Sequence, residues 1–376
     1  MKIDRWPIRW IVLGLVFLAF WLWPLRVMAA GPEDWKQYGL GLLPSKGDFP
    51  KLDTSGLRLT SLPSAVDLSW GLPPVGNQGS QGSCVGWALG YYYKTFQERA
   101  EHHWDVSSPE HQFSPSWIYN QRSGDCSQDA GMTFFEGLRI LQTKGAATLA
   151  MFPYNPYDAC TQPSETVCQL AWPYRIDSFA NIFAGQGTAN IETLKGLLAG
   201  GQPIALAVPV YSSFFAAASD DPPIIPQHTP NEYFYGGHAV LVIGYDDSLG
   251  AFKFVNSWGR SWGQNGYAYL SYDFVRNDAW EGWVMFDHVE TQASPATFSG
   301  EVTLNGEPVP EGTQVTAWID GVQVASTTTT MQNGRSRYTL EVPPDDPSTG
   351  EREGGRDGEV VRFKVGSEWA NERGTW

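Results

Sequence analysis

Three separate motifs supply one residue each, a cysteine, a histidine and an asparagine, and these residues could together form a nucleophilic site. Cys84 ends the run Gln-Gly-Ser-Gln-Gly-Ser-Cys, His238 follows two glycines, and Asn256 opens Asn-Ser-Trp-Gly. The pattern predicts that a helix begins at Ser83 or Cys84, where unpaired backbone N–H groups and the positive end of the helix dipole favour a thiolate. Cys84 is therefore the candidate nucleophile.

The side chains of His238, Asn256 and Gln78 fit the supporting roles that such a nucleophile needs. A neutral imidazole can take the proton of the thiol, and the resulting imidazolium holds the thiolate as an ion pair. Asn256 lies on the predicted strand next to that of His238, and its side-chain carbonyl can orient the ring. Gln78, on a Gly-rich loop, can donate its amide to a developing oxyanion together with the backbone N–H of Cys84.

Each of these residues also has an ordinary structural interpretation. A single cysteine in an exported protein is most often a disulfide partner, and a histidine at the start of a strand can be a hydrogen-bonded core residue. Asn256 could be a turn residue and Gln78 a loop residue. The four residues occurring together favour the catalytic interpretation.

The part of the chain that must position these residues contains both helical and strand patterns. Apolar spacings of three and four predict helices from Ser83 or Cys84 to about Arg99, around residues 134–145, and over 191–199. Strands are predicted at 203–210, 238–245, 252–257 and 266–272. Because helices come first and antiparallel strands last, residues 64–290 are expected to form an α+β domain.

The remaining segments differ in composition from this domain. Residues 31–63 are polar, punctuated by Gly and Pro and without periodicity, which indicates a strap or a short pro-segment. Residues 291–376 contain short alternating strands separated by Asn-Gly and Asp-Gly turns. This pattern predicts a small all-β sandwich, which would serve as an accessory module for substrate or surface attachment or as a spacer.

With these motifs in place, residues 62 to about 288 resemble the papain-like cysteine peptidases, and the surroundings of His238 and Asn256 look like those of bacterial members. The order Cys, His, Asn is that of the family, and the separation of 154 between Cys84 and His238 is close to the ~130–150 of papain and cathepsins. The resemblance implies a two-lobed fold, with the nucleophile on a helical lobe, His and Asn on an antiparallel β lobe, and a peptide cleft between them.

Two departures from the family pattern affect the region before the nucleophile. Val85 stands where the family usually has Trp, and Gln81 stands where it has a disulfide cysteine. The loop that contains Gln78 is therefore expected to be held by packing alone. The long helical inhibitory pro-region of plant and animal members is not recognisable in residues 31–63, which leaves the control of a zymogen open.

The other three cysteines allow one disulfide and leave one free thiol. The resemblance implies, by loose position within the family, a bridge from Cys126 to Cys160. A bridge from Cys160 to Cys168 is the alternative.

The first 30 residues are typical of an export signal. They contain four of the 25 basic residues near an uncharged apolar run over 10–25, followed by Val-Met-Ala. An uncleaved membrane anchor is the alternative interpretation, because 16 apolar residues are only slightly short of the ~20 that span a bilayer. Either way, the body of the protein is expected outside the cytosol, secreted or membrane-anchored.

Composition and charge exclude several function classes. The chain has 40 acidic and 25 basic residues, a net charge of −15, which argues against a nucleic acid partner. No Cys-x-x-Cys pair and no histidines at ligand spacing occur, so neither a metal nor another cofactor is expected. Hydrophobic residues make up 42% of the chain, enough to bury a core.

The sequence therefore predicts a monomeric, exported cysteine endopeptidase with protein or peptide substrates and an acyl-enzyme intermediate. A cell-wall amidase or a transglutaminase-like acyl transferase would use Cys84 and His238 in the same order. A binding protein with an inactive peptidase fold is the third hypothesis, and the intact set of four site residues argues against it.

Overall fold

The structure is a computed structural model, and it describes residues 35–57, 61–288, 295–345, 352–356 and 358–376. The predicted export segment, residues 1–30, lies outside the described residues. Within those residues, no helix is long and apolar enough to cross a membrane.

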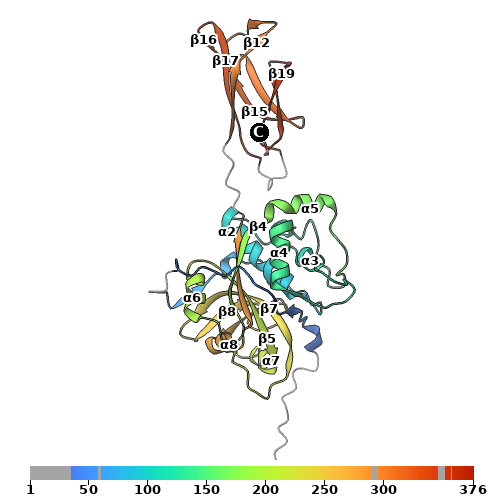
Figure 1. The fold of residues 1–376 in the computed structure, drawn as a ribbon, viewed down its shortest axis with the longest axis vertical. Coiled ribbons are helices and arrows are strands. Elements are labelled where there is room, and N and C mark those ends of the chain that lie inside the picture. The colour runs from blue at the N-terminus through green and yellow to red at the C-terminus, as the bar shows by residue number, and fades with distance from the viewer. Residues whose placement is uncertain (1–34, 58–60, 289–294, 346–351, 357) are drawn as a thin grey trace, which may run out of the picture.

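One part of the larger domain is helical and contains Cys84 (Figure 1). A continuous helical segment begins at Cys84 and ends at His102, three residues beyond the predicted end, and its middle is π-helical. The helix predicted to end near Gly145 is α4, which Gly145 terminates with a positive φ of 76°. The helices of this part are α1 (Cys84–Gly86), the π-helical η3 (Trp87–Lys94), α2 (Thr95–His102), α3 (Pro115–Tyr119), α4 (Phe134–Lys144) and α5 (Glu165–Ala171), with 3₁₀ turns η2 (Ser69–Gly71), η4 (Pro109–His111) and η5 (Trp172–Tyr174). A further 3₁₀ turn, η1 (Trp35–Gln37), belongs to the N-terminal segment.

The other part is built on an eight-stranded, mostly antiparallel sheet in the order β4-β10-β5-β7-β8-β9-β6, with β2 also paired to β7. Its central strand β7 contains His238, and β8 ends at Val255, so that Asn256 follows this strand instead of lying within it. The strands are β2 (Ala65–Asp67), β4 (Ile176–Ala184), β5 (Ile204–Tyr211), β6 (Ile224–Ile225), β7 (Phe234–Asp246), β8 (Ala251–Val255), β9 (Tyr267–Ser271) and β10 (Glu281–Asp287), accompanied by α6 (Ile191–Ala199), α7 (Ser212–Ala217) and α8 (Tyr272–Asn277). A separate parallel pair joins β1 (Leu42–Leu43) to β3 (Met132–Thr133).

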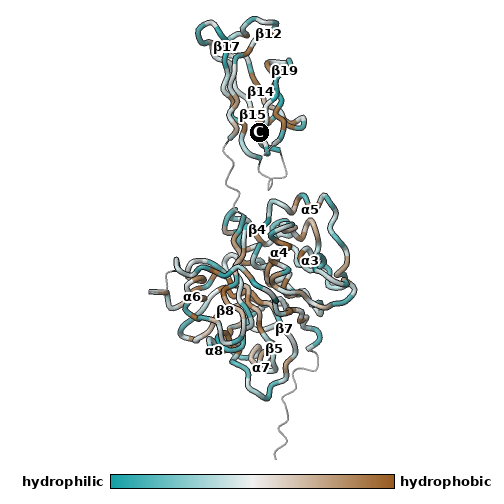
Figure 2. The backbone as a smooth tube through the Cα atoms, in the orientation of Figure 1, coloured by the Kyte–Doolittle hydropathy of each residue, from teal (hydrophilic) through white to brown (hydrophobic). Residues whose placement is uncertain are grey.

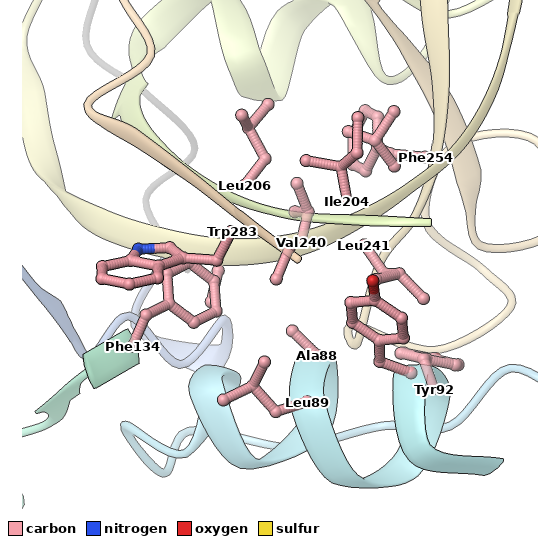
Figure 3. Close-up of a cluster of buried hydrophobic side chains, with 14 of the residues drawn as sticks. Ala88, Leu89, Tyr92, Phe134, Ile204, Leu206, Val240, Leu241, Phe254 and Trp283 are labelled. Atoms are coloured by element: carbon pink, nitrogen blue, oxygen red, sulfur yellow. The ribbon is translucent and has the colours of Figure 1, made fainter. Parts of the chain in front are cut away.

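The helix that starts at Cys84 packs directly against this sheet. Figure 3 shows Ala88, Leu89 and Tyr92 on the helix facing Val240 and Leu241 of β7. These side chains are at most 2% exposed and belong to one apolar core that contains residues of both parts. Figure 2 shows hydrophobic colouring gathered where the helices meet the sheet. Since the core fixes the helix on the sheet, it also fixes Cys84 relative to β7. The α+β fold predicted from the sequence is confirmed.

Among the described residues from 295 onward, the regular elements are all strands. A three-stranded sheet in the order β11-β17-β16 and a four-stranded sheet in the order β15-β14-β18-β19 contribute to one apolar core, made of residues such as Leu340 from the first and Phe363 from the second. The strands are β11 (Ala296–Glu301), β12 (Thr303–Leu304), β13 (Glu307–Pro308), β14 (Gln314–Ile319), β15 (Val322–Thr328), β16 (Thr330–Gln332), β17 (Arg335–Val342), β18 (Val360–Val365) and β19 (Glu368–Thr375).

Candidate active site

Cys84 occupies the first turn of the helix, and its side chain is fully buried. The preceding residue, Ser83, does not cap the helix with its side chain, because its hydroxyl pairs with the hydroxyl of Tyr154 at 2.8 Å. The backbone N–H groups of Cys84 and Val85 instead interact with the sulfur of Cys84. The sulfur therefore takes the place of a capping oxygen at the positive end of the helix.

The imidazole of His238 and the amide of Asn256 are joined by a hydrogen bond. The Nε2 atom of His238 lies 2.8 Å from Oδ1 of Asn256, and Trp258 stacks on the imidazole with ring centroids 4.4 Å apart. The backbone carbonyl of Asn256 accepts from the hydroxyl of Tyr92, which lies on the same helical segment as Cys84. With Nε2 bound, Nδ1 of His238 is buried and has no hydrogen-bond partner among the described residues. It is the nitrogen left to exchange a proton with a thiol.

Gln78 is buried, and both the nitrogen and the oxygen of its side-chain amide are hydrogen-bonded. Its Nε2 donates to the backbone carbonyls of Gln81 at 2.7 Å and Gly39 at 3.1 Å, while its Oε1 accepts from the hydroxyl of Ser257 at 2.5 Å. The amide orientation is therefore set by Ser257, which follows Asn256 directly in the chain.

Hydrogen bonds hold the loop over residues 78–83, so the expectation that packing alone holds it is wrong. The backbone N–H of Gly82 donates to both carboxylate oxygens of Asp129 at 2.9 Å. The backbone N–H of Gln78 donates to the carbonyl of Ser257 at 2.8 Å, and the hydroxyl of Tyr154 bonds to the carbonyl of Gln78 at 2.8 Å. These hydrogen bonds restrain the same loop that a disulfide at position 81 would restrain.

A segment from the polar N-terminal region, residues 35–52, crosses the site, and we call it the strap. Its Gly39 donates to the carbonyl of Gly79 and accepts from the side chains of Gln78 and Trp258. The N–H of Gly41 interacts with the sulfur of Cys84, and the carbonyl of Gly41 accepts from Met132 at 2.8 Å. The strap thus brings the backbone N–H of Gly41 to the sulfur.

Glycines make this close approach sterically feasible. A methyl group built on Gly41 would overlap the backbone carbonyl of Gly82, and one built on Gly39 would overlap the carbonyl of Gln81. On the opposite side, a methyl group on Gly131 would overlap the carbonyl of Gly41. The strap backbone can therefore lie this close to the loop over residues 78–83 and to Gly131 only because these positions have no side chain.

Further along, the strap is fixed to the β part. Ser45 donates its N–H to the buried carboxylate of Glu281 at 2.9 Å, and Leu52 donates to the carbonyl of Asn181 at 2.9 Å. Leu42 is 3% exposed. The pattern of polar, aperiodic residues could not predict the path of this segment, because these contacts are made with residues far away in the sequence.

Burial shifts both titratable groups toward their neutral forms. It raises the pKa of the Cys84 thiol to about 11, against the opposing effect of the N–H groups around the sulfur. Burial also lowers the pKa of His238 to about 4, opposed by the hydrogen bond to Asn256. The prediction that the helix start favours a thiolate thus fails while the strap is in place, because desolvation outweighs the helix dipole.

The structure joins Cys126 to Cys160 by a disulfide and leaves Cys84 and Cys168 free. The bridge links the loop that contains Asp129 to the loop that follows Tyr154, and both of these residues bind the loop over 78–83. The disulfide therefore supports one wall of the site.

Replacing Cys126 and Cys160 together with Ser should destabilise the domain. The bridge closes a loop with a sequence separation of 34, and such a constraint on the unfolded chain is worth about 2–4 kcal/mol. Urea unfolding followed by tryptophan fluorescence would measure the loss. Cys168→Ser, at a half-buried free cysteine, is the matched control and should change stability by less than about 1 kcal/mol. Equal midpoints for both variants would contradict a structural role for the bridge.

Sequence reasoning missed Asp129, Tyr154, Ser257 and the strap glycines. No local motif distinguishes Asp129 or Tyr154, since both act on the site from loops remote in sequence. The Gly-Leu-Gly run at 39–41 was a usable signal, because two glycines in an aperiodic segment indicate close backbone approach. Among the described residues, no group of three or more His, Cys, Asp or Glu side chains is arranged to hold a metal ion.

A protein-family model and a solved structure are both similar to this chain. The sequence model described as "Papain family cysteine protease" matches residues 62–279, more than half of the chain. The crystal structure of xylellain, a cysteine protease from Xylella fastidiosa, is 30% identical, with a TM-score of 0.58 over 66% of this chain and 96% of that one.

Two curated relatives match over part of their length. An uncharacterized peptidase C1-like protein, L477, of Acanthamoeba polyphaga mimivirus is 27% identical over 56% of this chain and 68% of that protein. Cathepsin B-like CP3 of Giardia intestinalis is 29% identical over 52% of this chain and 63% of that protein. The chain therefore spans about two thirds of the length of these relatives.

Proposed function

Because the chain belongs to the papain family of cysteine proteases, we propose that it is an endopeptidase that hydrolyses peptide bonds with Cys84 as nucleophile. The observation that carries this proposal is the hydrogen bond between Nε2 of His238 and Oδ1 of Asn256. It leaves Nδ1 of the imidazole free for proton exchange, beside a helix that begins at Cys84.

In this mechanism Nδ1 of His238 takes the thiol proton while Sγ of Cys84 attacks the carbonyl carbon of the scissile bond. The oxyanion of the tetrahedral intermediate accepts from Nε2 of Gln78 and from the backbone N–H of Cys84. His238 then gives its proton to the leaving amine, which departs and leaves a thioester on Cys84. A water molecule, deprotonated by His238, hydrolyses the thioester, and the proton returns to the sulfur.

Asn256 and Trp258 act as positioning residues in this proposal. The carbonyl of Asn256 fixes the ring orientation and can accept from the protonated ring, which supports the imidazolium that forms during the reaction. Trp258 covers the hydrogen bond with its indole. Tyr92 fixes the backbone of Asn256 to the helix that contains Cys84, so both halves of the site move as one unit.

The strap makes the described conformation a latent one. A substrate carbonyl cannot reach Cys84 while Gly41 lies against the sulfur, and Gln78 cannot serve an oxyanion while it donates to Gly39. We therefore propose that the strap must leave before catalysis.

Residues 1–30 would direct the chain out of the cytosol, either as a cleaved signal or as an anchor, and the substrates would then be extracytoplasmic proteins or peptides. The acidic chain, with a net charge of −15, gives no electrostatic attraction to polyanions overall.

The test combines thiol labelling with a substrate panel. Purified protein, before and after limited proteolysis that removes the strap, is incubated with an epoxide inhibitor of papain-type enzymes and with fluorogenic peptides. We expect stoichiometric labelling at Cys84 after strap removal, together with loss of peptide hydrolysis. Release of cell-wall peptides, or transfer to an added amine without peptide hydrolysis, would instead favour an amidase or acyl transferase. Failure of strap-free, folded protein to be labelled would refute a peptidase site at Cys84.

A further inference from the structure

The outer face of the four-stranded C-terminal sheet combines tryptophans with basic residues. Along β18, Val361 and Phe363 are buried in the core, so the alternate residues Arg362 and Lys364 point outward. The strand register places Trp318 opposite Arg362, Trp369 opposite Lys364, and Arg373 opposite Arg362. We call these five residues the aromatic–basic face: Trp318, Arg362, Lys364, Trp369 and Arg373.

The basic groups on this face are held in place by the indole rings. The Nζ atom of Lys364 lies 4.4 Å from the ring centroid of Trp318 and 4.5 Å from that of Trp369. The guanidinium carbon of Arg362 lies 4.2 Å from the centroid of Trp369. Cation–π contacts at these distances fix the side chains without neutralising their charge. Trp369 remains 42% exposed, so part of its apolar surface faces solvent.

The described strands that form this face carry few acidic residues, although acidic residues outnumber basic ones in the C-terminal region. Residues 296–376 contain 13 acidic and 7 basic residues. Strands β14, β15 and β18 contain no acidic residue, and Glu368 and Glu372 of β19 alternate with Trp369 and Arg373. Within the part of the chain that the structure describes, no ion pair involves Arg362, Lys364 or Arg373. Three of the seven cations thus remain available to an external anion.

We propose that the aromatic–basic face binds an acidic polysaccharide, a polymer of sugar rings that carry carboxylates. The planar guanidinium groups of Arg362 and Arg373 match carboxylates in bidentate geometry, and Lys364 adds a third positive charge. The exposed part of Trp369 offers apolar area to the C–H faces of a sugar ring. Neighbouring cations lie about 5–7 Å apart across and along the strands, so a chain with a charge on each ring can contact several at once.

Two other anionic partners fit the face less well. Single-stranded nucleic acids stack successive bases on several aromatic side chains, whereas of the two tryptophans on this face only Trp369 is exposed and Trp318 is half-buried. Anionic membranes are bound by apolar side chains that insert among the lipids, whereas these rings lie against cations on the face of a sheet. The proposal goes beyond the peptidase activity, because it assigns a ligand to the C-terminal strands.

The experiment measures binding of the full chain to alginate, a polyuronate, by isothermal titration at about 0.15 M salt. The test variant is Arg362→Gln/Lys364→Gln, and the matched control is Arg335→Gln/Arg337→Gln, which removes the same charge from β17 of the other sheet. We expect the Kd for alginate to rise at least about tenfold in the test variant, while the control changes it by less than about twofold. Thermal unfolding and peptide hydrolysis should be the same in both.

Further ligands separate this proposal from its alternatives. Polyglutamate supplies carboxylates without sugar rings, and dextran supplies sugar rings without carboxylates; both should bind more weakly than alginate. No binding of alginate by the wild-type chain, or equal losses in the test and control variants, would overturn the proposal. Tighter binding to single-stranded DNA or to phosphatidylglycerol vesicles than to alginate would overturn it in favour of that partner. None of these outcomes depends on activity at Cys84, so the peptidase proposal can fail or succeed separately.

Discussion

Cys84→Ala is expected to abolish peptide hydrolysis, lowering kcat by at least about 10³-fold relative to the parent protein with its strap removed. The substitution removes one buried sulfur atom at the start of the helix and leaves the hydrogen bond between His238 and Asn256 untouched. The hydroxyls of the two serines in this region are already engaged: Ser83 pairs with Tyr154, and Ser257 donates to Gln78. Steady-state kinetics on a fluorogenic peptide measure the loss.

The matched control for this prediction is Cys168→Ala, which removes the other free thiol. Its kcat and KM should equal those of the parent, and the epoxide should still label one site. The Cys84→Ala protein should keep its thermal unfolding midpoint within a few degrees, because the deleted atom is small. Hydrolysis by Cys84→Ala at more than about a tenth of the parental rate would exclude Cys84 as the nucleophile.

Local sequence signals were sufficient to predict which elements carry the chemistry-bearing residues, although His238 lies inside β7 instead of at its start and Asn256 follows β8. The 3–4 periodicity after Cys84 gave the helix start, and the apolar runs around His238 and before Asn256 gave two neighbouring strands, now seen as β7 and β8. These signals work because helix and strand periodicities are determined by residues close in sequence. The three motifs could therefore be assigned to one site before their distances were known.

The path of the strap and the support of the Gln78 loop could not be predicted in this way. Asp129 binds Gly82 across 47 positions, and Ser45 of the strap binds Glu281 across 236 positions. Strands β4 and β10, which anchor the strap's far end, pair with each other across about 100 positions and were not predicted. Such pairings depend on the assembled fold. The burial of Cys84 likewise arises only in the assembled fold, so an argument from the helix dipole alone could not predict the rise in its pKa.

Weakening the strap is expected to switch the site on. In Gly39→Ala/Gly41→Ala, each added methyl group would overlap a backbone carbonyl, that of Gln81 or that of Gly82. Overpacking of this kind costs about 1–3 kcal/mol per site, and the overlap disappears when the strap leaves the site. Peptide hydrolysis and labelling of Cys84 at pH 7 should therefore rise at least about tenfold over the intact chain. The substitutions lie in the strap itself, so the loop over residues 78–83 and the proposed catalytic residues keep their parental sequence.

The pH dependence of labelling provides a second readout of the same event. In the intact chain burial raises the pKa of Cys84 to about 11, so the thiolate is only about 10⁻⁴ of the thiol population at pH 7 and labelling should increase steadily with pH beyond 9. Once the strap leaves, water reaches the sulfur, the pKa of the thiol falls, and the labelling profile should shift toward neutral pH. The shift has this direction because removing the desolvation favours the charged form of the thiol.

Gly56→Ala is the matched control, since it makes the same chemical change in the same N-terminal region at a position with no atom within 4 Å of the added methyl group. It should leave both the hydrolysis rate and the pH profile of labelling at parental values. If the double variant and Gly56→Ala behaved alike, the strap would not be what restrains the site. A rise in hydrolysis without the shift in labelling would mean that the strap blocks substrate access alone, and that the neutral thiol persists in the open enzyme for a reason other than burial under the strap.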